Sequence, residues 1–402
     1  MPDVPPICHF CGRPRNEVKS LIESASGACI CNGCIEDATK ALEQEKSKKP
    51  EAAAAPLKKP REITALLDTI VIGQEDAKRE LAIAVYRHYR RREVSKDGGI
   101  LLDGERIEIE KSNVLLMGPS GTGKTLLARA IAKMLDVPFY VADCTRLTQA
   151  GYVGDDVETV LQGLLADAQQ NIEWAQWGII FLDEFDKLAR KSGRSASGYR
   201  DVTGEGVQQA LLKLIEGSKV PVPRGMGMRS GIAPVDTMDT SNILFIAAGS
   251  FAGIEEIIDK RLNKSSGIGF GKELCQNRDK TEIYKNVTTE DVEEFGLIPE
   301  IVGRLPVLVS TYQLTEEELI RILVEPKNAL CKQFRALFSL DGIELQFNQE
   351  ALQAIAKLAQ KRTTGARALR TIMEKVLKPY TYAASAGSNT STIHITKAEI
   401  IE

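Results

Sequence analysis

The fold of this chain is decided by the stretch Gly118-Pro119-Ser120-Gly121-Thr122-Gly123-Lys124-Thr125. An apolar run, 113–117, precedes it, and the stretch that follows, from Leu126 to Ala132, has helical periodicity. Glycines let a backbone curl so that its N–H groups face phosphate oxygens at a helix N-terminus, where the helix dipole also favours anions. The order of strand, glycine-rich turn and helix therefore predicts a phosphate-binding loop, in which the residues from Gly118 to Leu126 bind a nucleotide. A glycine-rich turn of purely structural use is the alternative.

The chemistry expected of this loop depends on two of its side chains and on two carboxylates further along the chain. Lys124 would neutralise charge on the β- and γ-phosphates, and Thr125 would coordinate Mg²⁺. A second apolar run, 179–182, ends in Asp183 and Glu184. Asp183 would hold the Mg²⁺ shell and Glu184 would polarise the attacking water, which together predict a nucleotide hydrolase. Alternatively, these acidic residues would cap the next helix.

From residue 63 to about residue 311, short apolar runs alternate with amphipathic stretches. The runs lack polar alternation, which suits strands buried on both faces of a parallel sheet covered by helices; they are 113–117, 138–141, 178–182 and 243–247. From Thr315-Glu316-Glu317-Glu318, which has the pattern of a capping box, the chain becomes mainly helical with one short strand at 343–347. The predicted fold class is α/β with a smaller helical domain. The predicted limits are 1–45 for an N-terminal module, 46–62 for a flexible linker, 63–313 for the α/β domain and 314–402 for the helical domain.

The composition excludes several classes of protein. The chain has 402 residues and a net charge of 52 − 55 = −3, and this balance does not support binding of nucleic acid by bulk electrostatics. The N-terminus lacks the basic start and the apolar run of a signal peptide, and no apolar stretch approaches the ~20 residues that span a bilayer. We therefore expect a cytoplasmic protein with no membrane or nucleic-acid partner. After a helix expected at 35–42, the Lys-, Glu-, Ala- and Pro-rich stretch 43–62 predicts a mobile tether, or a segment whose basic residues touch an anionic surface.

A cysteine cluster marks the N-terminal module. Five of the eight cysteines lie in the first 34 residues, and in a reducing compartment a tight cluster indicates metal more often than disulfides. Cys8 and Cys11 form one C-x₂-C pair, and Cys31 and Cys34 form another. Four thiolates spaced in this way predict one tetrahedral Zn²⁺ that holds together a module too small for its own core. Cys29 is a rival for Cys31 as a ligand.

Four further motifs match one family. They are Val71-Ile72-Gly73-Gln74, Gly151-Tyr152-Val153-Gly154, Gly303-Arg304 and Thr364-Gly365-Ala366-Arg367. With the phosphate loop and the cysteine pattern, they make the chain similar to the AAA+ ATPases and, among these, to the ClpX family of protein unfoldases, from Cys8 to about Leu377. The resemblance implies an AAA+ module, which is a parallel-sheet P-loop domain with a small helical domain, behind a treble-clef-like zinc module with four cysteine ligands. It places Ile72 in the adenine pocket.

The resemblance also implies roles for other single residues. Arg304 would reach the nucleotide of a neighbouring subunit as an arginine finger, and Arg367 would touch phosphate within its own subunit. Tyr152 and Val153 would grip a polypeptide in a central pore, although an isolated Gly-Tyr-Val-Gly also suits a turn with a core tyrosine. The tripeptide Ile268-Gly269-Phe270 resembles the loop that docks on the peptidase ClpP, and a buried loop anchor is its alternative.

The function that the resemblance implies is an ATP-dependent protein unfoldase and translocase. It would form a homohexamer, use ATP, Mg²⁺ and Zn²⁺, and thread unfolded or tagged proteins into a ClpP-type peptidase, with no peptidase activity of its own. The zinc module would dimerise and receive substrates or adaptors. The alternatives are an HslU-type unfoldase, against which the zinc pattern and the docking tripeptide weigh, and a zinc-containing DNA-remodelling AAA+ ATPase.

Two stretches depart from the family pattern. Where the family has a basic Arg-Lys-His loop at the pore entrance, this chain reads Pro223-Arg224-Gly225-Met226-Gly227-Met228-Arg229-Ser230-Gly231, with two arginines but no Lys or His. Its substrate preference is therefore expected to differ from the usual recognition of C-terminal tags. The apolar run from 243 ends in Ala248-Gly249-Ser250, which offers no Asn as a polar sensor, and none is assigned.

Overall fold

The computed structural model describes residues 6–24, 27–47, 57–96, 99–103, 105–148, 155–190, 204–223, 235–265, 283–362, 365–385 and 392–400. The pore pair Tyr152 and Val153, the docking tripeptide Ile268-Gly269-Phe270 and the segment 224–231 lie outside the described residues. The chain divides into two compact units, Met1–Leu57 and Lys58–Glu402.

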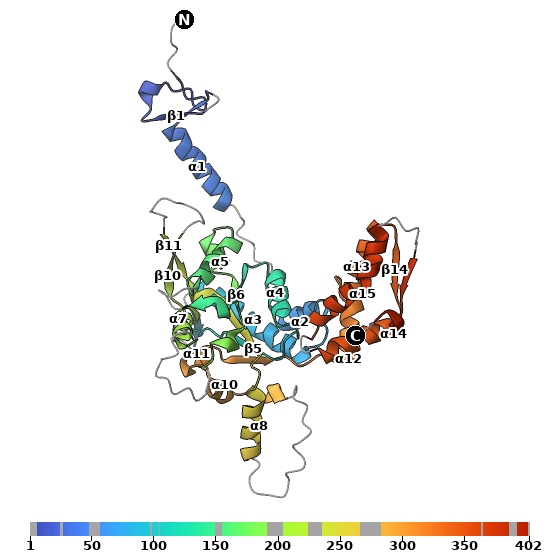
Figure 1. The fold of residues 1–402 in the computed structure, drawn as a ribbon. Coiled ribbons are helices and arrows are strands. Elements are labelled where there is room, and N and C mark those ends of the chain that lie inside the picture. Colours follow the sequence, from blue (N-terminus) through green and yellow to red (C-terminus); the bar gives the residue numbers. More distant parts are fainter. Residues whose placement is uncertain are drawn as a thin grey trace, which may run out of the picture. The chain divides into compact units, whose positions relative to one another are not determined.

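The first unit is built on a short antiparallel strand pair. Strands β1 (Leu21–Glu23) and β2 (Cys29–Cys31) pair with Leu21 opposite Cys31, a 3₁₀ turn, η1 (Arg15–Glu17), precedes them, and α1 (Asn32–Ser47) follows directly (Figure 1). The helix is longer at both ends than the predicted 35–42. Its C-terminal part, 41–47, contains mostly good helix formers and no Pro or Gly, so the helix continues into the stretch interpreted as a tether.

A five-stranded parallel sheet lies at the centre of the second unit. Its order is β13-β5-β12-β9-β6, and the strands are β5 (Val114–Met117), β6 (Phe139–Asp143), β9 (Ile179–Asp183), β12 (Leu244–Gly249) and β13 (Val307–Ser310). Four of the strands fall on the predicted apolar runs, and all residues of β5 and β12 are buried, as expected for strands covered on both faces. The fifth, β13, was not predicted, because it is a short edge strand in which only Val309 is buried.

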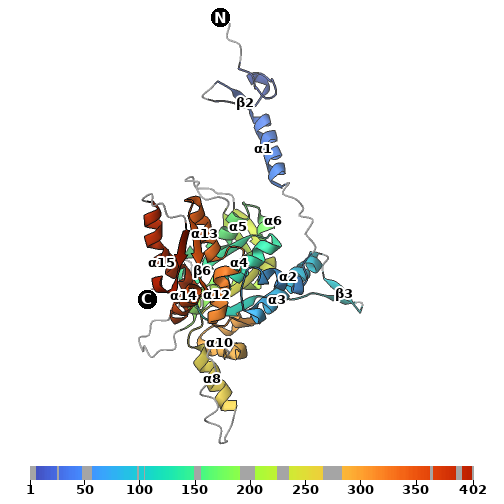
Figure 2. The same cartoon turned by 90° about the vertical axis from the view of Figure 1, so that its right-hand side faces the viewer.

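Some helices pack directly on the sheet and others extend from it (Figure 1). They are α2 (Pro60–Asp68), α3 (Glu75–Lys96), α4 (Lys124–Leu135), α5 (Thr159–Asp167), α6 (Ile172–Ala175), α7 (Gly204–Glu216), α8 (Ile254–Ser265), α10 (Thr289–Phe295) and α11 (Pro299–Gly303). Figure 2 shows α2 and α3 side by side. Helix α2 begins inside the predicted linker, since Pro60 suits the first helical position and the Glu62 carboxylate accepts a hydrogen bond from Lys59 N–H (2.9 Å).

The last part of the chain is a small helical domain, drawn in orange and red in Figure 1. It contains α12 (Glu316–Val324), α13 (Leu330–Leu340), β14 (Glu344–Phe347), α14 (Gln349–Lys361), α15 (Arg367–Ser385), β15 (Thr392–Ile395) and the turn η6 (Lys397–Glu399), around its own apolar core. The capping box predicted at Thr315 is confirmed: Glu318 N–H donates to Thr315 Oγ1 (3.2 Å), and Thr315 N–H donates to the Glu318 carboxylate (2.8 Å). One strand was predicted here, and the structure adds β15 as its parallel partner.

Shorter elements complete the second unit. Three two-stranded pairs are formed by β3 (Ile100–Leu102) with β4 (Glu105–Ile107), β7 (Leu147–Thr148) with β8 (Asp155–Asp156), and β10 (Lys219–Pro223) with β11 (Val235–Asp239). The described residues outside the helical domain also form the 3₁₀ turns η2 (Cys144–Arg146), η3 (Phe185–Leu188), η4 (Thr240–Asn242) and η5 (Tyr284–Asn286). Among the described residues, no helix is both long enough and apolar enough to cross a membrane.

Candidate nucleotide and metal sites

The parallel sheet gathers the site residues at one edge. Strands β5, β9 and β12 run in the same direction, with Met117 in register with Gly249 and with Asp143 opposite Asp183. The carboxyl ends of parallel strands meet at one edge of a sheet, which is where ligands bind in open α/β folds. The phosphate loop therefore leaves β5 beside the acidic end of β9.

Lys124 lies at the start of α4 and bends back over the loop. Its Nζ atom donates hydrogen bonds to the carbonyls of Gly118 (2.6 Å) and Pro119 (2.8 Å). Burial lowers the pKa of Lys124 to about 8, while the Asp183 and Asp186 carboxylates partly offset this effect. A polyphosphate in the loop would favour the protonated ammonium further, because a nearby opposite charge stabilises the charged form.

Thr125 and Asp183 form a pair of oxygen ligands. Thr125 Oγ1 donates to Asp183 Oδ2 at 3.4 Å, and Asp183 Oδ1 accepts a hydrogen bond from Glu184 N–H at 3.0 Å. A hydroxyl and a carboxylate are hard ligands of the kind that Mg²⁺ takes beside substrate phosphates. The residues present thus fit the predicted metal.

A cavity of about 570 Å³ joins the predicted groups. Its lining comes from the phosphate loop, from the ends of β9 and β12 and from the start of α15; the residues are Ser120, Gly121, Gly123, Lys124, Thr125, Leu126, Asp183, Glu184, Asp186, Lys187, Gly249, Ser250, Ala366 and Arg367. Arg367 belongs to the helical domain, so both parts of the second unit contribute to one site. A smaller cavity of about 210 Å³ adjoins the loop and is lined by Pro119, Ser120, Gly121, Thr122, Gln313, Leu314, Leu319, Gln360 and Gly365.

Five residues predicted for the nucleotide site do not line the large cavity. Three belong to the phosphate loop: Pro119 and Thr122 line the small cavity, and Gly118 lines neither. The other two are Arg304 and Ile72. Arg304 is half exposed, and its Nε atom donates to Glu216 Oε1 at 3.0 Å. Ile72 is buried in the loop between α2 and α3, and it lines neither the large nor the small cavity.

Asp186 and Ser250 line the cavity although the sequence did not mark them. The Asp186 carboxylate accepts hydrogen bonds from Ser250 N–H (3.2 Å) and from Ser250 Oγ (3.0 Å), and it also pairs with Lys187 (3.2 Å). The side chain of Asp186 is only 4% exposed. The available signal in the sequence was Ser250, a polar residue directly after the apolar strand β12.

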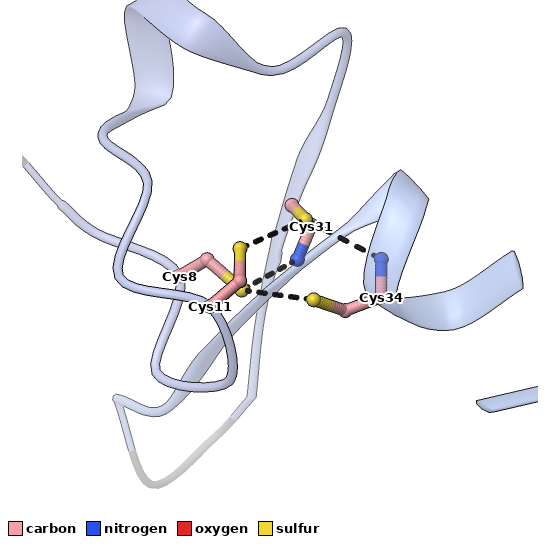
Figure 3. A group of neighbouring side chains, drawn as sticks. All are labelled: Cys8, Cys11, Cys31 and Cys34. Atoms are coloured by element: carbon pink, nitrogen blue, oxygen red, sulfur yellow. Dashed lines mark hydrogen bonds between the residues drawn. The ribbon is translucent and has the colours of Figure 1, made fainter. Parts of the chain in front are cut away.

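The first unit brings four cysteines together (Figure 3). The Sγ atoms of Cys8, Cys11, Cys31 and Cys34 all lie within 4.8 Å of one another, with 3.9 Å between Cys8 and Cys34 and 3.7 Å between Cys11 and Cys31. Zn–S bonds of about 2.3 Å in a tetrahedron place the sulfurs about 3.8 Å apart, so the cluster fits Zn²⁺. The rival Cys29 is not part of this cluster, and its thiol donates to Gly27 O (3.9 Å).

Backbone N–H groups donate to two sulfur atoms of this cluster. Cys31 N–H donates to Cys8 Sγ at 3.3 Å, and Cys34 N–H donates to Cys31 Sγ at 3.5 Å. Burial raises the pKa of the Cys8 thiol, but backbone N–H groups, those of Cys11 and Cys31 first, outweigh it and lower the pKa to about 6. A thiolate is the form that binds a metal.

Comparison with known proteins agrees with this geometry. An AAA domain (Cdc48 subfamily) matches residues 109–308, a ClpX C4-type zinc finger matches residues 6–44, and the C-terminal D2-small domain of ClpB protein matches residues 314–390. The chain is 46% identical to the ATP-dependent Clp protease ATP-binding subunit ClpX of Treponema denticola, over 92% of this chain and 88% of that protein. It is 43% identical to the protein of the same name from Borrelia duttonii, over 98% of this chain and 90% of that protein.

The matches favour one of the functions considered from the sequence. The AAA domain spans both the phosphate loop and the acidic strand end, which makes the chain an ATP hydrolase with ATP and Mg²⁺ as its cofactors. The zinc-finger match and the cysteine cluster add Zn²⁺, and both favour this family over an HslU-type unfoldase. The chain therefore belongs to the ClpX family of ATP-dependent AAA+ protein unfoldases.

Proposed function

We propose that this chain forms a homohexamer that couples ATP hydrolysis to the unfolding and translocation of proteins, and that it passes them to a ClpP-type peptidase. The observation that carries the proposal is the cavity in which Lys124, Thr125, Asp183 and Glu184 meet Arg367 of the helical domain. A site shared by two domains ties the chemistry of the nucleotide to their relative position. Membership of the ClpX family supports proteins as the substrates and the Clp protease as the partner.

Hydrolysis is assigned to groups at the sheet edge. Residues Gly118 to Leu126 would hold the phosphates, Lys124 would pair with their charge, and Thr125 and Asp183 would hold Mg²⁺, which neutralises charge on the transferred phosphoryl group. Glu184 lies exposed in the cavity beside Asp183, where its carboxylate would orient the attacking water. Ile72 would flank the adenine.

The two arginines are assigned different roles. Arg367 lines the cavity of its own chain, which supports contact with phosphate in cis. Arg304 lies outside that cavity and is half exposed, which supports a role in the site of a neighbouring subunit. Its ion pair with Glu216 is exposed and therefore weak, so breaking this pair to bind a phosphate instead would cost little free energy.

The mechanical assignments rest on the sequence. Tyr152 and Val153 would grip the polypeptide in the pore, and Ile268-Gly269-Phe270 would dock on the peptidase. The zinc module, with ligands Cys8, Cys11, Cys31 and Cys34, would dimerise and receive substrates or adaptors. The exposed side chains of Phe10 (75%) and Ile22 (57%) give it an apolar surface that suits this use. The domain limits 1–45, 46–62, 63–313 and 314–402 belong to the same proposal.

One assay tests the function. A stably folded fluorescent reporter with a degradation tag should lose fluorescence only with ATP, and it should be degraded only when ClpP is added. Tyr152→Ala should spare much of the ATPase but stop the fluorescence loss, whereas Phe270→Ala should stop degradation and leave unfolding intact. ATPase stimulated by DNA but not by an unfolded polypeptide would instead favour the DNA-remodelling alternative.

A further inference from the structure

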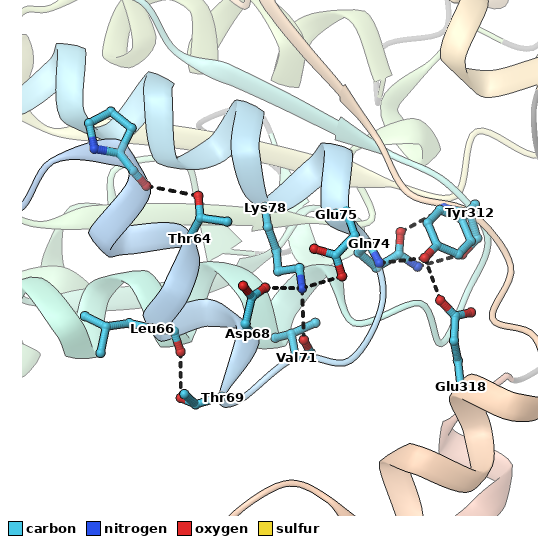
Figure 4. A network of polar contacts seen from close by, with 11 residues as sticks. Thr64, Leu66, Asp68, Thr69, Val71, Gln74, Glu75, Lys78, Tyr312 and Glu318 are labelled. Atoms are coloured by element: carbon cyan, nitrogen blue, oxygen red, sulfur yellow. Dashed lines mark hydrogen bonds and ion pairs between the residues drawn. The ribbon is translucent and has the colours of Figure 1, made fainter.

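Gln74 binds the backbone of Tyr312, which is 238 residues away in the chain (Figure 4). The Gln74 amide donates from Nε2 to Tyr312 O (2.7 Å) and accepts at Oε1 from Tyr312 N–H (3.0 Å). Gln74 is fully buried, and its φ of 61° is unusual for a residue with a side chain. The amide thus satisfies both backbone groups of Tyr312, as a neighbouring strand would do.

The Tyr312 hydroxyl extends this contact to the helical domain. It accepts a hydrogen bond from Gln74 N–H (2.8 Å) and donates one to Glu318 Oε1 (2.6 Å). Burial and the bond to Glu318 raise the pKa of Tyr312 to about 12, so the hydroxyl stays a donor. A Cβ atom on Gly73, which has a φ of +71°, would collide with Glu318 Oε1 and lie 2.9 Å from the Tyr312 hydroxyl. The loop before α3, the segment after β13 and the first turn of α12 are therefore packed together without spare room.

The loop that carries Gln74 is also fixed at its other end. Lys78 is only 1% exposed, and its Nζ atom donates to the carbonyl of Val71 (3.3 Å), to Asp68 Oδ1 (2.5 Å) and to Glu75 Oε1 (2.9 Å) (Figure 4). Because Lys78 ties the loop to α2 and α3, Gln74 offers Tyr312 an anchor on a rigid part of the α/β domain.

Tyr312 follows a residue that touches the phosphate loop. Thr311 N–H donates to Met117 O (2.7 Å), and the hydroxyls of Thr311 and Thr122 lie 2.8 Å apart. A Cβ atom on Gly118 would collide with Thr311. The next residues, Gln313 and Leu314, line the small cavity beside the phosphate loop, together with Leu319 of α12.

We propose that Gln74, Tyr312 and Glu318 form a latch that holds the helical-domain wall of the nucleotide pocket at a fixed distance from the phosphate loop. Tyr312 and Glu318 are positioning residues in this scheme, since neither lines the cavity that holds the catalytic groups. The latch acts on how tightly the nucleotide is held, and it leaves the hydrolytic step to Glu184 and the arginines. The inference rests on the proposed nucleotide site.

The test uses the full-length chain and compares two tyrosines. Tyr312→Phe removes the latch hydroxyl and keeps the ring. Tyr380→Phe removes a matched hydroxyl, which donates to Glu399 Oε1 (2.5 Å) inside the helical domain and lines neither cavity. We expect Tyr312→Phe to raise the KM for ATP about threefold to tenfold with kcat within about twofold of the parent, as the loss of one hydrogen bond predicts. Tyr380→Phe should change neither constant.

A second variant and a second measurement separate the possible failures. Glu318 accepts hydrogen bonds from the Tyr312 hydroxyl and from Thr315 N–H through different carboxylate oxygens. Glu318→Gln keeps one of these acceptor oxygens, so we expect a smaller rise in the KM for ATP than in Tyr312→Phe. This variant decides the question if Tyr312→Phe does not fold. An unchanged KM in the folded latch variants, or an equal rise in Tyr380→Phe, would overturn the latch. Titration with ADP needs no turnover, so weaker binding to Tyr312→Phe supports the latch even if the parent lacked ATPase activity and the proposed function failed.

Discussion

Ser250 donates two hydrogen bonds to Asp186, one from its backbone N–H (3.2 Å) and one from its hydroxyl (3.0 Å), although 64 residues separate them. The carbonyl of Ser250 in turn accepts from the Tyr284 hydroxyl (3.2 Å). The end of β12 is therefore tied to the turn η3, which directly follows Glu184.

Ser250→Ala should lower kcat for ATP about threefold to tenfold with little change in KM. The variant keeps the backbone bond to Asp186 but loses the hydroxyl bond, and the turn next to Glu184 is then held less firmly. Steady-state ATPase measurements test this. Ser218→Ala is the control, because among the described residues the buried Ser218 hydroxyl has no hydrogen-bond partner. Equal kcat values for the two variants would contradict a role for Ser250.

Glu184→Gln should bind ATP within about twofold of the parent and lose at least about 100-fold in turnover. The amide keeps the shape and the neighbours of Glu184, but it cannot accept a proton from the attacking water as a carboxylate does. Nucleotide titration and a phosphate-release assay measure the two properties. Retained hydrolysis would remove Glu184 from its assigned role.

Removal of zinc should unfold the first unit and spare the ATPase. Cys34→Ser should release Zn²⁺, because three thiolates bind the metal more weakly than four. The ATPase activity should stay within about twofold of the parent, because the nucleotide site lies in the other unit. Cys29→Ser is the matched control and should keep its zinc, since that thiol donates to Gly27 O. A zinc-sensitive dye measures the metal content, and loss of zinc from Cys29→Ser alone would contradict the ligand assignment.

The stability of the second unit should fall in acid because of His88. This ring is 3% exposed and donates from Nε2 to Asn242 O (3.1 Å); burial first, and then the charges of Lys111, Arg91 and Arg92, lower its pKa to about 3. Below about pH 6.5 the unfolded chain binds this proton, whereas the folded chain does not. The neutral His88 therefore makes its full contribution to the free energy of unfolding above pH 6.5. This contribution is lost as the pH falls towards 3, by up to about 1.4 kcal/mol per pH unit.

Urea unfolding at several pH values tests this expectation. His88→Gln keeps an amide N–H for the Asn242 carbonyl and cannot titrate, so its unfolding free energy should depend less steeply on pH. His394→Gln, at an exposed position in β15, should leave the slope as in the parent. If the unfolding free energy depended on pH equally in all three proteins, the pKa of His88 would be the same in the folded and the unfolded chain, which would contradict the expectation.

The sequence predicted those features that lie in short contiguous stretches. The phosphate loop, the acidic end of β9 and the cysteine pairs each occupy a few adjacent residues, and the four predicted strands are continuous apolar runs. The edge strand β13 and the second small strand β15 escaped because each is four residues long and only partly buried. Local pattern carries too little signal for such strands.

Features made by distant segments could not be predicted. The pairing of Asp186 with Ser250 and that of Gln74 with Tyr312 depend on how β12 and β13 approach the loops beside them. A buried side-chain hydrogen bond has no periodicity along the chain, so one sequence alone does not reveal it. The start of α2 at Pro60 was not predicted, because Pro60 lies in the Lys-, Glu-, Ala- and Pro-rich stretch 43–62, whose composition is typical of a tether.

Gly118 is subject to two independent demands, because the proposed function has the loop approach phosphate at this residue and Thr311 fills the space where a Cβ atom would stand. A library that redesigns nucleotide preference should therefore keep glycine at position 118 throughout. A bulkier residue there would displace the connection to the helical domain, and the resulting failure of the motor would say nothing about phosphate recognition.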